Sequence, residues 1–384
     1  MSKGYPVSAT ELFTSMRDKG DTNLYIAAAG AASQLQSYAF SVPGASAYLV
    51  GCTFPYSTHD FDAFVGYSPK SYASAEGARA LAIAAYIRAK ADCAHDLTKK
   101  PKKAIGLGLS CAVTAFRPRK GKNKVYGCVI SDDGCYEVYK ELKKTEDPDL
   151  AMEARIYDDL AADKVGLNLL CKVWGLEVND DTITTLDDLT LMSDLLTRPL
   201  FLPNGQRRHA PEIKEAQGKI ILYPGSFNPA HEGHRRTAEL AVSDTYFGMH
   251  SEVVPYITID PPHKDTITPV DLLTRIAYLQ IQMPEHKVLV SRGDPMYVDK
   301  AARWPGVTML LGSDSLDRML DPKYGFTMES LSKHFAASKT FMIIVSRNGG
   351  VFNPAHRMVC PMEWIGSPEN KNISSTQIRK SWGL

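Results

Sequence analysis

The apolar positions in the first half of the chain fall into strand-length and helix-length patterns. Strands are predicted at 46–54, 103–116 and 123–131, where short apolar runs lie between turn-forming residues. The Ala-rich segment 75–91 and the amphipathic segment 149–176, which ends near Gly175, predict helices. Because strands that alternate with helices pack in layers, residues 1–178 are expected to form a layered α/β domain.

The second half of the chain alternates more regularly. Strands are predicted at 220–223, 252–257, 286–292, 307–314 and 340–347. Helices are predicted between them, for example at 232–247 and 269–283. This order predicts a doubly wound, mostly parallel sheet, a Rossmann-like α/β domain, over residues 218–384. Residues 179–217 are first acidic and then rich in Pro, Gly and Arg, which predicts a short helical connector followed by a linker.

Composition and charge limit the class of protein. A chain of 384 residues with 44% hydrophobic residues can form two or three domains, each with its own core. A formal net charge of +1 argues against a dedicated binder of nucleic acid or of membrane surfaces. The seven cysteines are dispersed and contain no CxxC pair, which indicates reduced thiols in a cytoplasmic protein. The polar N-terminal residues predict no secretory signal, and no apolar run reaches membrane-spanning length.

The segment ILYPGSFNPAHEGH, residues 221–234, places a glycine turn and two histidines at the end of a predicted strand. Gly225 permits a tight turn and lets backbone N–H groups approach a phosphate. His231 and His234 fall near the start of the next helix, where free N–H groups and the helix dipole favour an anion. Gly233 leaves room for a nucleotide ring. The segment therefore predicts a site that positions a polyphosphate and neutralises charge that develops on it.

A second anion site is predicted near the C-terminus, in the segment NISSTQIRK, residues 372–380. Ser374, Ser375 and Thr376 stand at a helix start, where hydroxyl and N–H groups can hold a phosphate. Arg379 lies one turn further on and can add a bidentate positive group.

The patterns GSFxPxHxGH and ISSTxIR together resemble the HxGH nucleotidyltransferase superfamily. The segments DPPHK (260–264) and LLGSDSL (310–316) narrow this resemblance to the bacterial nicotinamide/nicotinate mononucleotide adenylyltransferases, over about residues 219–384. The resemblance implies that the 5′-phosphate of a mononucleotide attacks the α-phosphorus of ATP with Mg²⁺ present. A pyridine dinucleotide and pyrophosphate would result.

The resemblance also implies roles for individual residues. Catalysis would fall to His231, His234 and Arg379. Binding of ATP and its phosphates would fall to Gly225, Ser226, Phe227, Asn228, Gly233, Lys264, Gly312, Asp314, Ser374, Ser375 and Thr376. For Asp314, a ribose contact and a cap for the following helix remain alternatives. For Lys264 the alternative is an ordinary surface lysine, and no residue is predicted to ligate a metal.

One segment departs from that family. Where the family has a Ser-Tyr-Thr stretch, this chain has DPMYVDK at residues 294–300. Tyr297 can still stack on a pyridine ring and is assigned to the mononucleotide site. The sequence identifies no group that would distinguish the acid from the amide.

The motif recurs in part as VFNPAH, residues 351–356. The position three after His356 is Val359 rather than histidine, and Pro361 argues against a long helix. We interpret this copy as a chance similarity in a surface loop and not as a second active site.

The first domain resembles the C-terminal domain of CinA, the nicotinamide-nucleotide amidase family, through residues 40–58 and the later SAEGARALA. Ser46 and Tyr56 match residues of that family, but its lysine position is Phe61 here. A serine nucleophile requires an activating base, so we predict an inactive or divergent amidase-type domain. If activity is retained, His59 is the candidate substitute base.

The predicted partners are ATP and a pyridine mononucleotide, in a homo-oligomer that contacts neither nucleic acid nor membrane. The basic stretches at 99–103 and 117–124 could form an anion patch or a nuclear targeting signal, but are interpreted as solvated loops. Two alternative functions remain. One is another HxGH transferase that uses CTP or a different phosphorylated acceptor, and the other is a non-catalytic nucleotide sensor or scaffold.

Overall fold

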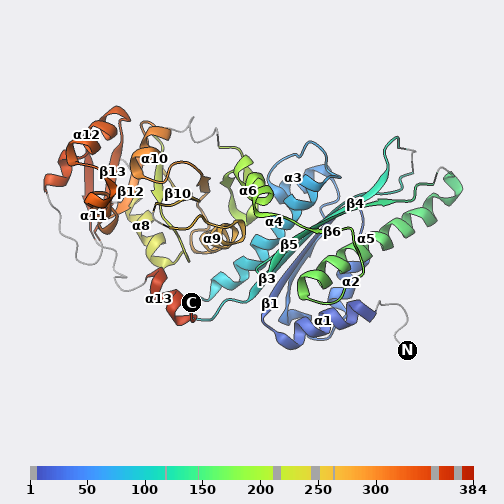
Figure 1. Cartoon of the computed structure of the whole chain (residues 1–384). Helices are drawn as coiled ribbons and strands as arrows, with labels where there is room; N and C mark the ends of the chain where they lie inside the picture. Colours follow the sequence, from blue (N-terminus) through green and yellow to red (C-terminus); the bar gives the residue numbers. More distant parts are fainter. Residues whose placement is uncertain are drawn as a thin grey trace. The chain divides into compact units, whose positions relative to one another are not determined.

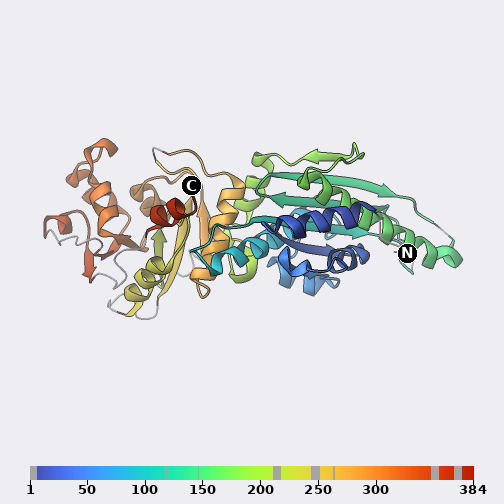
Figure 2. The same cartoon turned by 90° about the horizontal axis from the view of Figure 1, so that it is seen from below.

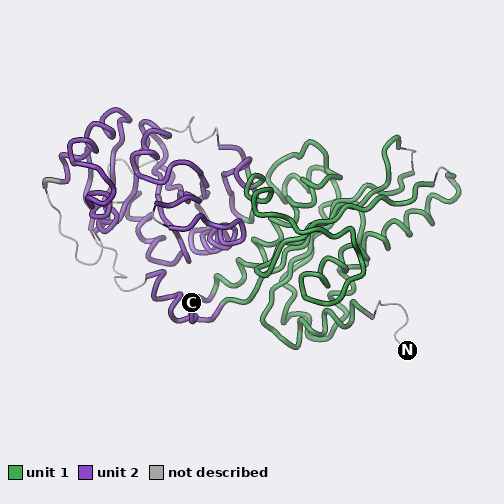
Figure 3. The backbone as a smooth tube through the Cα atoms, in the orientation of Figure 1, with its two compact units in different colours: residues 1–95, 101–194, 204–207 green, residues 96–100, 195–203, 208–384 purple. Residues whose placement is uncertain are grey.

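The computed structural model describes most of the chain, and its described residues divide into two compact units (Figure 3). The described residues are 7–116, 119–145, 147–210, 218–243, 251–262, 264–346, 354–366 and 374–384. Unit 1 comprises Met1–His95, Pro101–Asp194 and Asn204–Arg207. Unit 2 comprises Asp96–Lys100, Leu195–Pro203 and Arg208–Leu384.

Unit 1 is built on a six-stranded mixed sheet with the strand order β2-β1-β3-β4-β5-β6 (Figure 1). Its strands are β1 (Thr22–Ala29), β2 (Leu49–Thr53), β3 (Lys103–Ala112), β4 (Asn123–Ser131), β5 (Gly134–Leu142) and β6 (Ile183–Thr185). Strand β1 pairs parallel with β2 and β3, whereas the ladders from β3 to β6 are antiparallel. The last strand comes from the segment expected to be a connector, and α6 (Asp188–Thr197) follows it.

Helices cover both faces of this sheet (Figures 1 and 2). They are α1 (Val7–Lys19), α2 (Gln34–Phe40), α3 (Thr58–Val65), α4 (Ala75–Asp92) and α5 (Ala151–Trp174). Side chains alternate along a strand, so Leu24 and Ile26 of β1 pack with α1, α2 and α5, while Ala27 and Ala29 pack with α3 and α4. This arrangement confirms the predicted layered α/β architecture.

Several element boundaries differ from the sequence prediction. The strand expected at 46–54 begins only at Leu49, because Gly44 adopts φ 86° and starts a 3₁₀ turn over Ala45–Ala47. The strand expected at 103–116 ends at Ala112. Helix α5 closes as expected, since Gly175 adopts φ 82° at its C-terminus. The sequence pattern did not predict β1, β5 or the helices α1, α2 and α3.

The second sheet, whose strands belong to unit 2 except for Arg207 of β8, has eight strands in the order β14-β13-β12-β9-β10-β11-β7-β8. Its strands are β7 (Leu200–Phe201), β8 (Arg207–Arg208), β9 (Ile220–Pro224), β10 (Glu252–Thr258), β11 (Val288–Ser291), β12 (Thr308–Gly312), β13 (Phe341–Val345) and β14 (Met362–Ile365). The six strands from β14 to β11 are parallel, and β7 pairs antiparallel with β11. In chain order the parallel strands are arranged 6-5-4-1-2-3, which confirms the doubly wound, Rossmann-like fold.

The helices of unit 2 follow the strands. They are α8 (Glu232–Ser243), α9 (Pro269–Gln282), α10 (Tyr297–Arg303), α11 (Ser313–Met319), α12 (Met328–Ala337) and α13 (Ser375–Ser381). Met309 and Leu311 of β12 share one apolar cluster with α10, α11 and α12, while α8 contacts β10 and β13. The predicted strand 307–314 ends at Gly312 because α11 starts at Ser313. Within the described part of the chain, no helix is both long enough and apolar enough to cross a membrane.

The strand order fixes where a ligand can bind in unit 2. Chain order reverses between β9 and β12, which are neighbours in the sheet although β10 and β11 lie between them in sequence. Open parallel sheets bind ligands outside the carboxyl ends of their strands at this switch point. The HxGH segment leaves the sheet there, directly after β9.

Candidate active site

The turn after β9 is held by a buried aromatic residue. Phe227 is fully buried with φ 44°, and its ring meets the ring of Tyr223 edge-on with centroids 5.3 Å apart. A Cβ on Gly225 would lie 2.8 Å from the Phe227 ring, so only glycine fits without displacing that ring. The backbone N–H of Gly225 also donates to the carbonyl of Tyr256 on β10, at 3.1 Å. The turn is therefore anchored on both sides.

The two histidines are buried at the start of α8 and fixed by the local backbone. The N–H of His231 donates to Nδ1 of His234 at 3.2 Å, and the N–H of Gly233 donates to Nδ1 of His231 at 3.1 Å. The ring centroids are 4.0 Å apart. An Nδ1 atom that accepts an N–H carries no proton, so in the neutral imidazole the proton resides on Nε2. In that tautomer the remaining N–H donor of each ring is on Nε2.

The C-terminal motif docks onto the HxGH segment. Arg379 Nη1 donates a hydrogen bond to the carbonyl of Asn228, and Ser375 Oγ donates to the carbonyl of Pro229 at 2.9 Å. Ser374 is the N-cap of α13, where its hydroxyl accepts from the N–H of Gln377 at 3.2 Å. The structure thus brings together two motifs that lie about 150 positions apart in the sequence.

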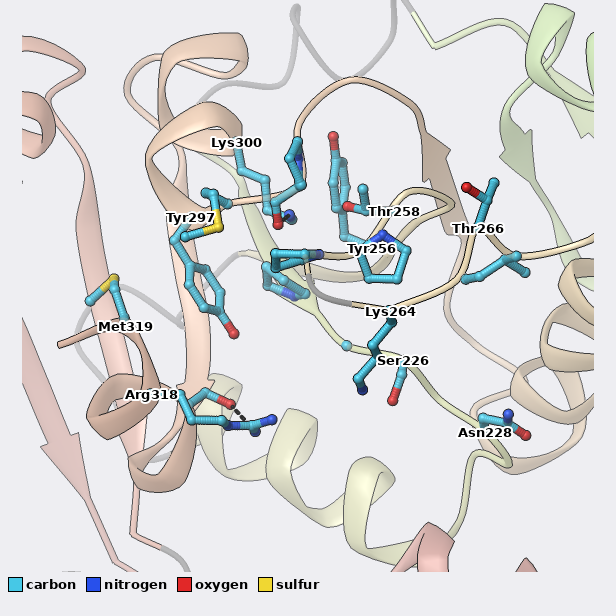
Figure 4. A pocket seen from close by; sticks show the side chains of 18 of the residues that line it. Ser226, Asn228, Tyr256, Thr258, Lys264, Thr266, Tyr297, Lys300, Arg318 and Met319 are labelled. Atoms are coloured by element: carbon cyan, nitrogen blue, oxygen red, sulfur yellow. Dashed lines mark hydrogen bonds between the residues drawn. The ribbon is translucent and has the colours of Figure 1, made fainter. Parts of the chain in front are cut away.

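A cavity of about 780 Å³ opens beside these motifs at the carboxyl ends of β9, β10 and β11 (Figure 4). The predicted site residues that line it are Gly225, Ser226, Asn228, Lys264, Tyr297 and Arg379. The predicted residues that do not line it are His231, His234, Phe227, Gly233, Gly312, Asp314, Ser374, Ser375 and Thr376. Figure 4 shows Lys264 next to Ser226, and Tyr297 on another side of the cavity.

Basic side chains dominate the charge of the cavity wall. Its cations are Lys264, Arg275, Lys300, Arg318 and Arg379, and its carboxylates are Asp265 and Asp271. Such an excess of positive charge favours a polyphosphate.

Arg275 was not predicted from the sequence, but it supports the turn after β9. It is only 9% exposed, pairs with Asp271 at 2.6 Å, and donates from Nη1 to the carbonyl of Ser226 at 3.0 Å. The sequence signal that could have found it is an arginine four positions after an aspartate, among the apolar residues of a predicted helix.

A second group of unpredicted residues lies at the ends of β10 and β11. Asp294 is buried and accepts hydrogen bonds from the hydroxyls of Tyr256 and Ser291, the latter at 2.5 Å. Burial, together with the Asp294 carboxylate, raises the pKa of Tyr256, so its hydroxyl stays protonated and donates. Lys300 Nζ donates to the carbonyls of Asp294 and Pro295, at 2.6 and 2.9 Å.

Asp314 lies in the first turn of α11 and pairs with Arg318 at 2.7 Å. The N-cap of that helix is Gly312, and no side chain caps it. Asp314 therefore does not cap the helix, contrary to one of the two alternatives from the sequence. Its other carboxylate oxygen is buried and has no hydrogen-bond partner among the described residues.

In unit 1, the residues that match the amidase family do not converge on a base. Ser46 is exposed in the 3₁₀ turn before β2, and Tyr56 is 65% exposed with its hydroxyl 3.3 Å from Arg155 Nη2. Phe61 is buried in the apolar cluster of α3 and α4, edge-on to Tyr72. His59 lies exposed on α3.

The remaining sequence features play no part in the cavity. Residues 351–353 of the repeated VFNPAH lie outside the described residues, and His356 lies on a 3₁₀ turn, Pro354–Met358, that does not line the cavity. In the basic stretches, Lys103 pairs with Asp133 at 2.7 Å and Lys122 with Glu141 at 2.8 Å. All seven cysteines are free thiols, as predicted.

The fold and the site together define a nucleotidyltransferase-like domain, with a basic cavity at the switch point of a doubly wound sheet. Comparison with protein families agrees, since residues 222–381 match the cytidylyltransferase-like family. A comparison with curated protein sequences finds no match.

Several solved structures are similar to parts of this chain. One is the nicotinic acid mononucleotide adenylyltransferase of Plasmodium falciparum complexed with NaAD, with 16% identity and a TM-score of 0.32 over 42% of this chain and 82% of that one. Another is the competence/damage inducible protein CihA of Agrobacterium tumefaciens, with 15% identity and a TM-score of 0.32 over 45% and 99%. A CinA superfamily protein of Escherichia coli is similar at 13% identity, with a TM-score of 0.29 over 40% and 86%.

Proposed function

We propose that unit 2 is an adenylyltransferase that joins ATP and a pyridine mononucleotide into a dinucleotide and releases pyrophosphate. The observation that carries this proposal is the docking of Arg379 and Ser375 onto the carbonyls of Asn228 and Pro229. This docking holds the C-terminal motif against the HxGH segment, and Arg379 lines the basic cavity together with Gly225, Ser226 and Asn228 of that segment. The match of residues 222–381 to the cytidylyltransferase-like family supports a nucleotidyl transfer of this kind.

In the proposed reaction, an oxygen of the acceptor's 5′-phosphate forms a bond to the α-phosphorus of ATP. The bond from that phosphorus to the α–β bridging oxygen breaks, and pyrophosphate leaves. The attacking phosphate is mostly ionised at neutral pH, since its second pKa is about 6, so no general base is required. Mg²⁺ enters with ATP as part of the substrate and neutralises phosphate charge.

The chain supplies positioning and positive charge for this step. His231 and His234 donate from Nε2 to phosphate oxygens at the N-terminus of α8, and Arg379 stabilises the charge that develops on them. Lys264 contacts the phosphates from the loop after β10. Tyr297 presents its ring to the pyridine of the acceptor.

We further propose that unit 1 does not act as an amidase. Ser46 and Tyr56 are surface residues, and the position of the family's base is occupied by the buried Phe61. A serine hydroxyl without a base remains a weak nucleophile. Unit 1 would instead contribute binding or assembly, in a homo-oligomer.

The test uses the full-length protein with ATP, Mg²⁺ and either nicotinate or nicotinamide mononucleotide. Release of pyrophosphate with formation of the matching dinucleotide supports the proposal. Turnover only with CTP, or only with a different phosphorylated acceptor, would support the wider transferase class instead. Nucleotide binding without any turnover would indicate a sensor.

A further inference from the structure

Lys300 is a buried cation on the wall of the cavity. It is 5% exposed, and Figure 4 shows it on the same side of the cavity as Thr258 and Tyr256. Two of its three donors are used by the carbonyls of Asp294 and Pro295. Among the residues that the structure describes, none places a carboxylate oxygen within 4.0 Å of Nζ.

The Asp294 carboxylate does not form an ion pair with Lys300. That carboxylate is bound by the hydroxyls of Tyr256 and Ser291, and it also faces Arg303 at 3.8 Å. Burial consequently lowers the pKa of Lys300 to about 8, despite the more distant charges of Asp294, Asp299 and Asp260. A buried ammonium without a counter-charge is costly, and an anion entering the cavity would relieve that cost.

The position of the ammonium indicates where this anion would lie. Lys300 Nζ is 5.8 Å from the ring centroid of Tyr297 and 5.9 Å from that of Tyr256, and both rings line the cavity. An aromatic ring stacked on Tyr297 therefore has its edge beside the ammonium. A short anionic substituent on that ring can reach Nζ, whereas the phosphates bind at the HxGH segment.

We propose that Lys300 is a specificity-determining residue, which binds a carboxylate on the pyridine ring of the acceptor and thereby selects nicotinate mononucleotide over nicotinamide mononucleotide. This inference rests on the proposed adenylyltransferase function. The amide form would place a cationic pyridinium ring beside a buried ammonium with no anion between them. The acid form adds one negative charge at the ring edge, which lies between the two cations, reduces their repulsion and forms a charge-assisted hydrogen bond with the ammonium.

The experiment compares kcat/KM for the two mononucleotides in the full-length protein with saturating ATP and Mg²⁺. The wild type should prefer the acid. Lys300→Gln keeps N–H donors for the two carbonyls but removes the charge. It should lower kcat/KM for the acid by roughly 10- to 100-fold and leave the value for the amide within about threefold. Lys264→Met is the matched control, because it removes a lysine assigned to ATP and should lower both values while preserving their ratio.

Two kinetic outcomes would overturn the role of Lys300 and leave the proposed adenylyltransferase function intact. One is a wild-type preference for the amide, which needs no variant to be measured. The other is an unchanged acid-to-amide ratio in a Lys300→Gln protein whose thermal melting shows that it is folded. Calorimetric binding of each mononucleotide without ATP tests the role of Lys300 separately from the proposed adenylyltransferase function. Acid-selective binding that Lys300→Gln abolishes supports the role even without turnover, and equal binding of both forms excludes it.

Discussion

The backbone N–H of His231 donates a hydrogen bond to Nδ1 of His234, with the two nitrogens 3.2 Å apart. The N–H of Gly233 does the same for Nδ1 of His231. The motif backbone thus selects one tautomer of each ring, with the proton on Nε2. The spacing of the two histidines around a glycine therefore also has a structural consequence, because it lets the backbone of the motif bind Nδ1 of both rings.

The first prediction concerns His234. If its Nε2–H donates to a transferring phosphate, His234→Ala should lower kcat by roughly 10²-fold or more, because a preorganised donor to the transition state is lost. His234→Gln places an amide nitrogen near the position of Nε2, whereas His234→Asn places one near Nδ1. The Gln variant should therefore retain more activity than the Asn variant, measured as pyrophosphate release.

His356→Ala is the matched control for this series, because His356 lies in the repeated motif but away from the cavity. It should keep normal turnover. Near-normal turnover in His234→Ala would remove the assigned role, and a large loss in His356→Ala would show that the repeated motif contributes to activity after all.

The second prediction separates docking from catalysis in the C-terminal motif. Arg379 both binds the Asn228 carbonyl and lines the cavity, whereas Ser375 only binds the Pro229 carbonyl. Arg379→Ala should lower kcat by roughly 10²-fold. Ser375→Ala should chiefly lower stability, by about 1 kcal/mol for one lost hydrogen bond. Steady-state kinetics and thermal melting of both variants provide the test, and equal losses of kcat would mean that docking of α13 accounts for the whole effect.

The sequence predicted the five strands from β9 to β13 because they are buried on both faces, whereas the short strands β7, β8 and β14 were not predicted. Strands buried on both faces are continuous apolar runs, and the turn at Gly225 marks the end of the first of the five. In unit 1 the strand TNLYIAAA was missed because its alanines favour helices, and only packing between two helical layers makes it a strand. Tertiary burial overrode local preference there.

The half of the candidate site that is proposed to bind phosphate could be predicted because its residues lie in two short motifs. The other half could not. Asp294 is about 36 to 38 positions from Tyr256 and Thr258, and the three meet only because β10 and β11 end side by side. Lys300 faces the same place from the first helix after β11. A hydrophobic pattern along the chain does not indicate which strand ends meet in the fold. The available signal for Lys300 was therefore its place in residues 294–300, the segment that differs from the family pattern.

The third prediction concerns Ser46. Full-length protein should release little or no ammonia from nicotinamide mononucleotide, because Phe61 cannot accept a proton at the position of the missing base. Ser46→Ala should leave adenylyl transfer unchanged, since Ser46 belongs to unit 1 and the cavity to unit 2. Ammonia release that Ser46→Ala abolishes would make the protein bifunctional, and His59→Ala would then test the substitute base.

The last prediction uses a buried carboxylate that joins two helices of unit 1. Asp163 on α5 is 2% exposed, and its Oδ1 accepts from the N–H of Leu35 in the first turn of α2, at 2.8 Å. Its Oδ2 has no hydrogen-bond partner among the described residues. Burial, and secondarily the charge of Asp159, raises the pKa of Asp163 from 3.8 to about 7.

A raised carboxylate pKa makes the folded state hold a proton that the unfolded chain has already lost. Between about pH 4 and pH 7 the free energy of unfolding should therefore fall as pH rises, by an amount on the order of 2 to 4 kcal/mol from Asp163 alone. Asp163→Asn keeps the acceptor for the Leu35 N–H but cannot ionise, so it should remove this loss and be more stable than the wild type at pH 8. Urea unfolding at pH 5 and pH 8 measures the difference, with the exposed Asp181→Asn as a control that should keep the wild-type slope. If Asp163→Asn loses as much stability between the two pH values as the wild type does, then Asp163 is already ionised in the folded protein at pH 5.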